Sequence, residues 1–192
     1  MCFVGKVHLP DFLQQRLESK TGQVIEIPAT ASVFKNGFAD DNLVAISARY
    51  ELTPDLGEVI GEHKGAHYYT VGQRKGLSLG GFERPIFVIG TDTVRNIIYT
   101  GMGEDHPGLF RKGLFVPQPE EHWIRPDLQL AVGTSARYRA RIRYRQQLTD
   151  CTLFKKEEGL YIIFDRPQKS ITPGQFVAWY NDDELVGSGV IE

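Results

Sequence analysis

The chain has 192 residues, a length that suits one large domain or two small ones. Its 41% hydrophobic and 24% charged residues are typical of a soluble protein, and its net charge of −2 neither favours nor excludes nucleic acid as a partner. No apolar run reaches the roughly 20 residues that span a bilayer, and two cysteines are too few for a disulfide framework, so we expect a cytoplasmic protein without membrane contact.

The first part of the chain shows a helical pattern and then a strand pattern. Apolar residues recur at helical spacing between residues 9 and 17, which predicts one short amphipathic helix over residues 10–18. Further on, the apolar period changes to two and predicts strands at 24–27 and 42–47. Residues 28–41 form an excursion between these strands.

Residues 67–81 are the least ordinary stretch of the chain. They combine three aromatic or imidazole rings, the adjacent cations Arg74 and Lys75, and four glycines. Each glycine would cost a helix interior roughly 1 kcal/mol relative to alanine, so we expect a short turn, bracketed by Gly72 and Gly76, that presents the two cations. Such a turn can receive a phosphate through side-chain charge and backbone N–H groups, although a solvated loop can have the same composition. The spacing matches neither a Walker loop nor a dinucleotide-binding loop.

A hairpin follows, with strands predicted at 85–90 and 96–100. Together with the strands at 24–27 and 42–47, it makes a small central β-rich domain. Residues 101–113 then form the interdomain connection, because turn-forming residues gather there. We expect His106 in this connection to have a structural role, capping backbone groups in a turn.

The rest of the chain reads as short strands separated by turns, with no helical period. The candidate strands are 113–117, 121–125, 132–146, 150–155, 159–164, 175–180 and 184–191. Six or seven short strands at regular spacing predict a small closed antiparallel β-barrel. The expected fold class is therefore mainly β: a small central β-rich domain followed by this barrel, with one short N-terminal helix.

Residues 134–145 alternate without a break, and five arginines share one face of the predicted strand. They are Arg137, Arg139, Arg141, Arg143 and Arg145. The rise of two strand residues sets neighbouring guanidiniums about 6.7 Å apart. No acid occurs between Asp127 and Asp150, so acids on other strands, solvent or a polyanion must compensate these charges. Acidic neighbours would make this a structural face, whereas an RNA backbone would match the guanidinium forks.

The stretch Tyr-Thr-Val-Gly-Gln-Arg-Lys-Gly-Leu at residues 69–77 closely resembles a signature of the bacterial tRNA-specific 2-thiouridylases, the MnmA or TrmU family. This family was formerly labelled tRNA (5-methylaminomethyl-2-thiouridylate)-methyltransferase. Four further stretches match it in the same order: Cys-Phe-Val-Gly at 2–5, Gly-Glu-Asp-His-Pro at 103–107, Ile-Arg-Tyr-Arg-Gln at 142–146 and Thr-Pro-Gly-Gln at 172–175. The five ordered matches span nearly the whole chain and correspond to the C-terminal half of the family.

The resemblance divides the chain into three parts. Residues 1–20 match the tail of a catalytic domain and a linking helix, and residues 109–192 match a C-terminal β-barrel. Between them lies a central β domain at 21–108, with an insertion near 28–58 relative to the family.

The resemblance also implies a reaction. In the family, the cysteine that matches Cys2 is one of two catalytic cysteines, and it receives a persulfide sulfur from a cysteine desulfurase or a sulfur-relay protein. The enzyme adenylates the C2 oxygen of the wobble uridine with ATP and then replaces that oxygen with sulfur. The ATP site, with its Mg²⁺, and the partner cysteine lie in the family's N-terminal domain. These 192 residues are therefore expected to bind no cofactor or metal and to be inactive alone.

Contacts with the anticodon region of tRNA are implied as well. The Arg-Tyr pair of the family's barrel strand matches Arg143 and Tyr144, and the Gln after Thr-Pro-Gly matches Gln175. Four other cations are weaker candidates that supply supporting charge: Arg74, Lys75, Arg141 and Arg145.

A stand-alone, non-catalytic β-barrel RNA-binding module is the alternative function, and for such a module Cys2 is incidental. The methyltransferase activity of the older family label is not supported, because no glycine-rich loop after a strand offers a place for a methyl-donor nucleotide. Cys151 lies in a predicted strand, where we expect a buried structural thiol.

Overall fold

The computed structural model describes residues 19–35, 42–77 and 79–192. Cys2 and the helix predicted at 10–18 lie outside these residues. Within them, none of the helices is long and apolar enough to cross a membrane.

The chain divides into two compact units. The first takes in the described residues up to 31 together with 52–106, and the second takes in 32–51 together with 107–192. The described residues within 32–51 therefore pack with the second unit, whereas the sequence analysis places this segment in the central domain.

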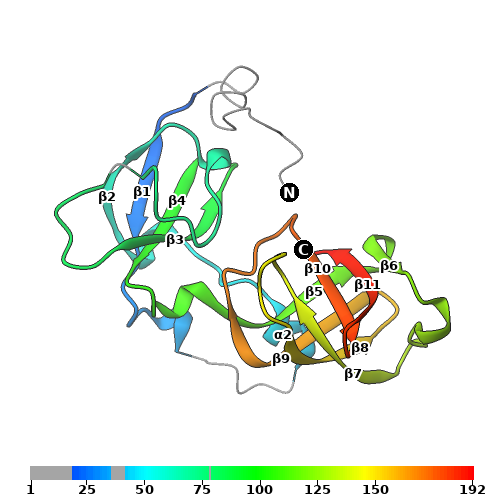
Figure 1. Cartoon of the computed structure of the whole chain (residues 1–192). Helices are drawn as coiled ribbons and strands as arrows, with labels where there is room; N and C mark the ends of the chain where they lie inside the picture. The colour runs from blue at the N-terminus through cyan, green and yellow to red at the C-terminus, as the bar shows by residue number, and fades with distance from the viewer. Residues whose placement is uncertain (1–18, 36–41, 78) are drawn as a thin grey trace. The chain divides into compact units, whose positions relative to one another are not determined.

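The first unit contains a four-stranded sheet with the strand order β2-β1-β4-β3 (Figure 1). Its strands are β1 (Gly22–Glu26), β2 (Glu58–His63), β3 (Ile86–Asp92) and β4 (Ile97–Met102). β1 runs parallel to β4, whereas the β1–β2 and β3–β4 pairs are antiparallel. The predicted hairpin and the first predicted strand are confirmed, but β2 has no counterpart among the predicted strands.

The core of this sheet also holds the glycine-rich run. Val88 of β3 and Ile98 of β4 are fully buried, and they belong to one apolar cluster with Ala66 and Leu77. Burial of apolar side chains stabilises at roughly 25 cal/mol per Å². The run between Ala66 and Leu77 is therefore anchored at both ends to the sheet.

The second unit contains a seven-stranded antiparallel sheet that curves into a half-barrel (Figure 1). The strand order is β5-β9-β8-β7-β10-β11-β6. The strands are β5 (Phe110–Pro117), β6 (Glu121–Trp123), β7 (Ser135–Arg141), β8 (Thr149–Lys155), β9 (Gly159–Lys169), β10 (Phe176–Asn181) and β11 (Glu184–Val190). The mainly β fold class and the seven antiparallel strands agree with the prediction.

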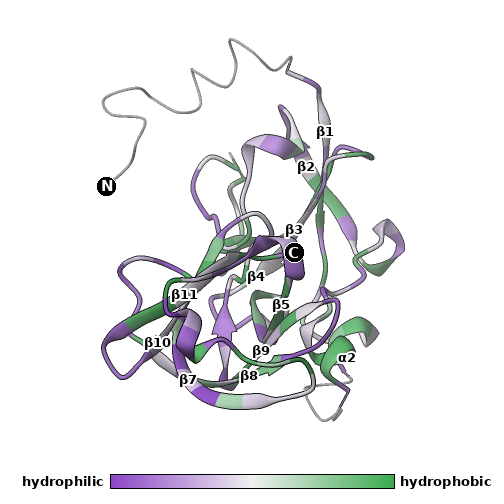
Figure 2. Ribbon diagram, turned by 90° about the vertical axis from the view of Figure 1, so that its right-hand side faces the viewer, coloured by the Kyte–Doolittle hydropathy of each residue, from purple (hydrophilic) through white to green (hydrophobic). Residues whose placement is uncertain are grey.

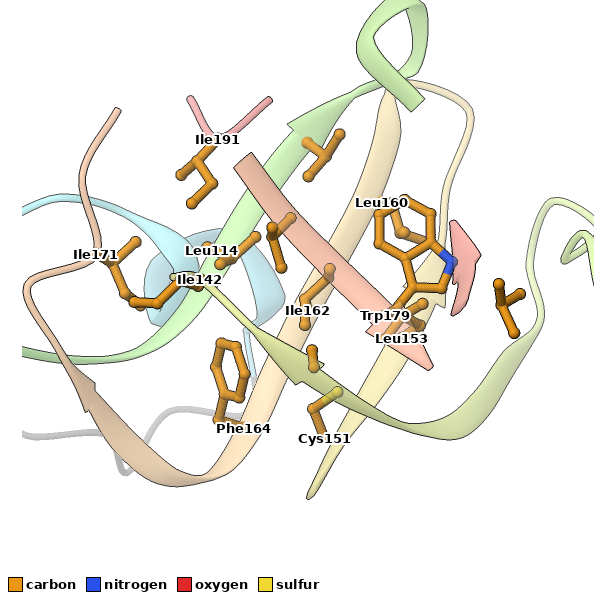
Figure 3. Close-up of a cluster of buried hydrophobic side chains, with 14 residues drawn as sticks. Leu114, Ile142, Cys151, Leu153, Leu160, Ile162, Phe164, Ile171, Trp179 and Ile191 are labelled. Atoms are coloured by element: carbon orange, nitrogen blue, oxygen red, sulfur yellow. The ribbon is translucent and has the colours of Figure 1, made fainter. Parts of the chain in front are cut away.

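One face of every long strand in this sheet packs into a single apolar core (Figure 3). Trp179 and Phe164 are its largest fully buried side chains, and Leu114, Leu153 and Ile162 fill the space around them. The alternation of buried and exposed residues along the strands follows from the period of two that the sequence shows.

Residues 42–47, predicted as a strand, form a helix instead, α2 (Leu43–Ser47). The missed signal is the N-cap: the side-chain oxygen of Asn42 accepts from the backbone N–H groups of Val44 and Ala45 at 3.0 and 3.4 Å. The helix is almost wholly hydrophobic in composition (Figure 2) and packs against β5 and β9. Six single turns of 3-10 helix complete the fold: η1 (Ser32–Phe34), η2 (Pro54–Leu56), η3 (Ala66–Tyr68), η4 (Pro107–Leu109), η5 (Gln118–Glu120) and η6 (Pro126–Leu128).

Candidate nucleic-acid interface

The outward face of β7 carries Arg137 and Arg139, and acids compensate both. Nη1 and Nη2 of Arg137 donate to the two carboxylate oxygens of Asp165 at 2.7 and 2.6 Å. This pairing raises the pKa of Arg137 and lowers that of Asp165. Nη2 of Arg139 donates to the carboxylate of Asp183 at 2.9 Å and also to the backbone carbonyl of Asp182. For these two arginines, the structural interpretation of the alternating pattern holds.

Arg141, the last residue of β7, is used within the protein. Its guanidinium lies over the ring of Tyr180 on β10, and both Nε and Nη2 donate to the Tyr180 hydroxyl. Nη1 donates to the backbone carbonyl of Tyr144 at 3.2 Å. Since all three nitrogens have partners, Arg141 supports the loop that follows.

The strand predicted to continue to residue 146 in fact ends at Arg141. The side chain of Gln146 closes a turn beyond it, because its Oε1 accepts from the N–H of Ile142 at 3.1 Å. The backbone N–H of Gln146 also donates to the carbonyl of Arg143 at 3.1 Å, and its Nε2 donates to Gln168 on β9 at 2.6 Å. Ile142 stays in the core, but the three residues after it are all exposed. The alternation predicted through this segment is therefore wrong beyond Ile142, and Tyr144 faces solvent.

The turn that follows β9 meets this loop at the carbonyl of Ser170. Nη2 of Arg143 donates to that carbonyl at 3.3 Å, and Oγ1 of Thr172 donates to it at 3.0 Å. The turn then closes as the N–H of Gln175 donates to the carbonyl of Thr172 at 3.3 Å. Arg143 and Gln175 thus lie on two turns that share one hydrogen-bond acceptor.

We refer to five residues on these two turns as the barrel corner: Arg143, Tyr144, Arg145, Gln175 and Phe176. All five are exposed, and the exposed fraction is 80% for Tyr144 and 64% for Phe176. The two segments that build the corner, 128–149 and 166–181, contain arginines and a lysine but no acid. The barrel corner therefore combines two arginines with two exposed aromatic rings, the combination that single-stranded RNA favours. One acid lies close to it, because Glu192 follows Ile191, whose N–H donates to the carbonyl of Gln175 at 2.8 Å.

Phe176 is a member of the corner that the sequence analysis does not identify. It lies in the strand predicted at 175–180, where Val177 and Trp179 are fully buried. The alternation of that strand alone directs Phe176 away from the core. The sequence could have identified Phe176, because it is a large apolar residue at an outward strand position directly after Gln175.

The glycine-rich run forms the predicted turn in the first unit. Gly72 and Gly76 both have a φ of 87°, a left-handed conformation that glycine adopts without strain. The side chain of Gln73 braces the turn, because its Nε2 donates to the carbonyl of Lys75 at 2.8 Å. The side chains of Arg74 and Lys75 are exposed, and Arg74 lines an open cavity of about 370 Å³. These two cations belong to the other unit and form a candidate contact separate from the barrel corner.

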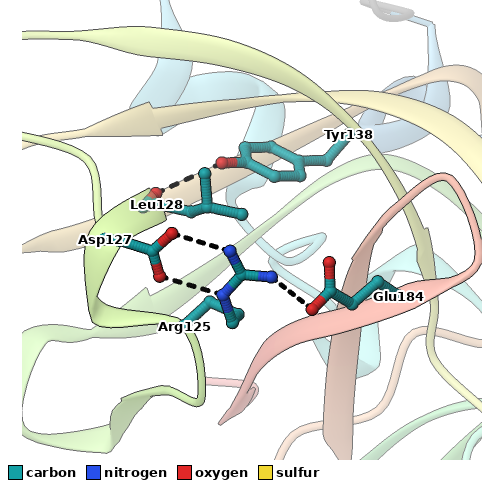
Figure 4. Close-up of polar contacts among 5 residues, drawn as sticks. All are labelled: Arg125, Asp127, Leu128, Tyr138 and Glu184. Carbon is teal, nitrogen blue, oxygen red and sulfur yellow. Dashed lines mark hydrogen bonds and ion pairs between the residues drawn. The ribbon is translucent and has the colours of Figure 1, made fainter.

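Arg125 provides an internal comparison, because it is an arginine whose charge is fully compensated (Figure 4). Its Nε and Nη2 donate to the two oxygens of Asp127 at 2.9 and 2.7 Å, and its Nη1 donates to Glu184. The hydrogen bonds to Asp127 and Glu184 raise the pKa of Arg125. An arginine in this setting gains little from meeting a phosphate.

Cys151 and His106 have the structural roles that the sequence predicts. Cys151 is fully buried, its Sγ donates to the carbonyl of Tyr138 at 3.4 Å, and burial raises its pKa to about 12. Nε2 of His106 donates to the carbonyl of Ile27 at 3.0 Å, and burial lowers the pKa of His106. Across the described ranges, no group of three or more His, Cys, Asp or Glu residues could hold a metal ion.

Two family models match the chain. The tRNA methyl transferase PRC-barrel domain matches residues 42–102, and the aminomethyltransferase beta-barrel domain matches residues 114–191. The first match begins inside the segment 28–58 that the sequence analysis treats as an insertion. Between them, the two models match most of the chain.

The chain is also similar along its whole length to proteins named tRNA-specific 2-thiouridylase MnmA. It is 53% identical over 196 residues to the protein of Christiangramia forsetii, 41% identical over 191 residues to that of Karelsulcia muelleri and 36% identical over 196 residues to one of Pseudomonas aeruginosa. These matches take in 100% of this chain but 50%, 48% and 44% of the relatives. The chain therefore spans about half the length of the curated relatives it matches.

Proposed function

Because this chain belongs to the tRNA-specific 2-thiouridylase family, we propose that its barrel corner binds tRNA, in the anticodon region, for sulfur transfer to the wobble uridine. The observation that carries the proposal is the meeting of the Arg143 loop and the Gln175 turn at the carbonyl of Ser170. Arg143 offers a guanidinium fork for a phosphate, and Tyr144 offers a ring for a base. Gln175 offers a donor and an acceptor for a base edge or a ribose.

The charges around the corner support the same assignment. Arg137 and Arg125 are held by carboxylates, and Arg139 is held by Asp183. Arg143, by contrast, donates to a neutral carbonyl, so its positive charge is not compensated by that contact. A phosphate approaching this side of the sheet therefore gains more from Arg143 than from the paired arginines.

The activity of the whole protein is part of the proposal. We expect ATP-dependent thiolation at C2 of the wobble uridine, with Cys2 carrying a persulfide sulfur delivered by a cysteine desulfurase or a sulfur-relay protein. We place the ATP site, with its Mg²⁺, outside these 192 residues, as the family resemblance implies. These residues contribute by holding the tRNA, and we expect the 192-residue chain to be inactive by itself. A cytoplasmic location stays a prediction from the cysteine content.

The test is tRNA binding by the chain and by two sets of variants. Fluorescence anisotropy would measure the Kd for a tRNA with a wobble uridine at several salt concentrations. We expect Arg143→Ala with Gln175→Ala to weaken binding at least tenfold, which corresponds to about 1.4 kcal/mol. The slope of log K against log salt should fall by about 0.7 to 0.9 for one lost phosphate contact.

Arg137→Ala and Arg125→Ala are the matched controls. Each removes one positive charge, but that charge is compensated by a carboxylate in the wild-type protein. Both controls should leave affinity and salt slope close to those of the wild type. If Arg137→Ala and Arg125→Ala each weakened binding as much as the double variant Arg143→Ala with Gln175→Ala, only net charge would matter and the proposed site would be contradicted.

A further inference from the structure

Phe176 is a large apolar side chain on the outward face of β10. Its exposed fraction is 64%, whereas its strand neighbour Val177 and the next inward residue, Trp179, are fully buried. β10 therefore contributes Val177 and Trp179 to the core, and Phe176 is not part of it. An exposed ring adds little to the stability of the fold and leaves its face available for a partner.

The pairing of β10 places Phe176 near the end of β7 that leads into the Arg143 loop. Ala178 pairs with Arg141 across the two strands. Phe176 precedes Ala178 by two residues, and the β7–β10 pairing ends at this pair, where β7 gives way to the loop that carries Arg143. On the other side of β10, Phe176 pairs with Val190 of β11.

Two of the outward side chains near Phe176 are small, although Val190 of β11 lies directly opposite it. Ala178 follows on the same face of β10, and it pairs with Ser188 of β11. Beyond Ala178, the guanidinium of Arg141 is fixed over the ring of Tyr180, with its central carbon 4.8 Å from the ring centroid. Ala178 thus lies between Phe176 and Tyr180 on β10, and Ser188 pairs with it on β11 and with His122 on β6; we refer to Ala178 and Ser188 as the floor.

We propose that Phe176 stacks on an unpaired nucleobase of the bound RNA, with the base lying over Ala178 and Ser188. This inference rests on the proposed tRNA-binding function and extends it to a residue with a distinct role. An aromatic ring offers its face to any base, and the arginines of the barrel corner attract the phosphates that flank such a base. The favoured partner is therefore single-stranded, as in an anticodon loop, because the bases of a helix have no free face for the ring.

The experiment compares two RNAs of equal length, a tRNA and a fully paired duplex. Phe176→Ala should weaken binding of the chain to the tRNA about tenfold and leave the affinity for the duplex unchanged, since stacking on one base is typically of that size. Phe176→Trp should keep tRNA affinity, and its added indole fluorescence should be quenched by the bound RNA. The salt slope should stay at the wild-type value in both variants, because no phosphate contact is removed.

Two further variants separate stacking from a structural role. Ser188→Leu should fill the floor beside the ring and weaken tRNA binding while Phe176 is still present. Leu185→Ala removes another exposed apolar side chain of β11 and should leave affinity unchanged. Thermal unfolding should show that Phe176→Ala is as stable as the wild type.

The outcomes distinguish this inference from the proposed function. If Phe176→Ala binds tRNA like the wild type while Arg143→Ala with Gln175→Ala binds weakly, the stacking role is wrong and the proposed function stands. If none of these variants changes tRNA affinity, both are wrong. Equal losses on tRNA and duplex would also overturn the stacking role, because an unpaired base would then not be the partner.

Discussion

The guanidinium of Arg141 lies 4.8 Å from the centre of the Tyr180 ring, and its Nε donates to the Tyr180 hydroxyl at 3.1 Å. From this fixed position, Nη1 reaches the carbonyl of Tyr144 in the loop that carries two residues of the proposed tRNA contact. Arg141 is therefore a positioning residue: it holds the loop from which Arg143 and Tyr144 are proposed to contact the RNA.

Arg141→Met should weaken tRNA binding through the loop that Arg141 holds. Loss of the hydrogen bond to Tyr144 frees the loop, and we expect a fivefold to tenfold loss of affinity, about 1 kcal/mol, typical of one hydrogen bond. Amide hydrogen exchange at residues 143–146 should accelerate in the same variant. The measurement is anisotropy with tRNA, combined with exchange mass spectrometry.

A double-mutant cycle distinguishes positioning from direct contact. In an Arg143→Ala background, Arg141→Met should have little further effect on affinity, because the loop no longer presents the fork that Arg141 positions. Additive losses in the cycle would mean that Arg141 contacts RNA independently, as the sequence analysis allows.

Lys155 and Glu121 form a buried ion pair within the half-barrel. Nζ of Lys155 on β8 lies 2.5 Å from Oε1 of Glu121 on β6, with exposed side-chain fractions of 7% and 4%. Glu121→Gln should lower the free energy of unfolding by about 3 to 5 kcal/mol, because it leaves a buried ammonium without its counter-charge. Urea titration followed by tryptophan fluorescence would measure the change.

The paired replacement Lys155→Met with Glu121→Leu is the informative control. Removing both charges leaves no uncompensated ion, so this variant should recover most of the stability lost in Glu121→Gln. A double variant as unstable as Glu121→Gln would mean that the pair stabilises the half-barrel through its hydrogen bonds, including the one from Trp123 to Glu121 at 3.3 Å.

The half-barrel could be predicted from the sequence because its strands bury one face and expose the other. Val177 and Trp179 alternate with outward residues, and such a period of two identifies both the strand and its core side. The family motifs likewise pointed to Arg143 and Gln175. That the turns bearing these residues meet at Ser170 was not readable, because the residues that build this junction come from segments far apart in the chain.

Two elements were predicted wrongly because local hydrogen bonds from single side chains determine where they begin or end. Asn42 starts a helix where the apolar run Leu-Val-Ala-Ile suggests a strand, and a run this short is ambiguous between the two. Gln146 likewise ends β7 by binding the backbone of Ile142, although the alternation of arginines continues in the sequence. The pattern of five arginines could not show which ones meet acids, since Asp165 and Asp183 lie on other elements.

Cys151 should resist thiol reagents in the folded protein. Burial raises its pKa to about 12 from an ordinary value near 9, so almost no thiolate forms at pH 8.5. In a Cys2→Ser background, iodoacetamide should label Cys151 slowly without denaturant and rapidly in urea, as measured by mass spectrometry. The raised pKa also makes the stability of the folded chain depend on pH. Above pH 9 the unfolded chain loses the thiol proton more readily than the folded chain does, so the free energy of unfolding falls as the pH rises from 9 towards 12. Rapid labelling of the folded chain would contradict its burial.

The first unit should lose stability in mild acid because of His106. Burial lowers the pKa of this imidazole below the ordinary 6.5, so the unfolded chain binds the proton more tightly than the folded chain does. The contribution to stability is thus complete above about pH 6.5 and is lost as the pH falls below it, by at most about 1.4 kcal/mol per pH unit for one proton. His63 shifts in the same direction and should add to the effect.

The measurement must follow the first unit itself. Both tryptophans, Trp123 and Trp179, belong to the second unit, so their fluorescence does not report on the first. Amide hydrogen exchange of β1 and β4 between pH 7 and pH 5, corrected for the intrinsic exchange rate, would give the free energy of opening at each pH. His106→Gln should reduce the slope of that free energy with pH, whereas His122→Gln, at an exposed position of β6, should leave it unchanged. A wild-type slope in His106→Gln would show that other groups cause the acid sensitivity.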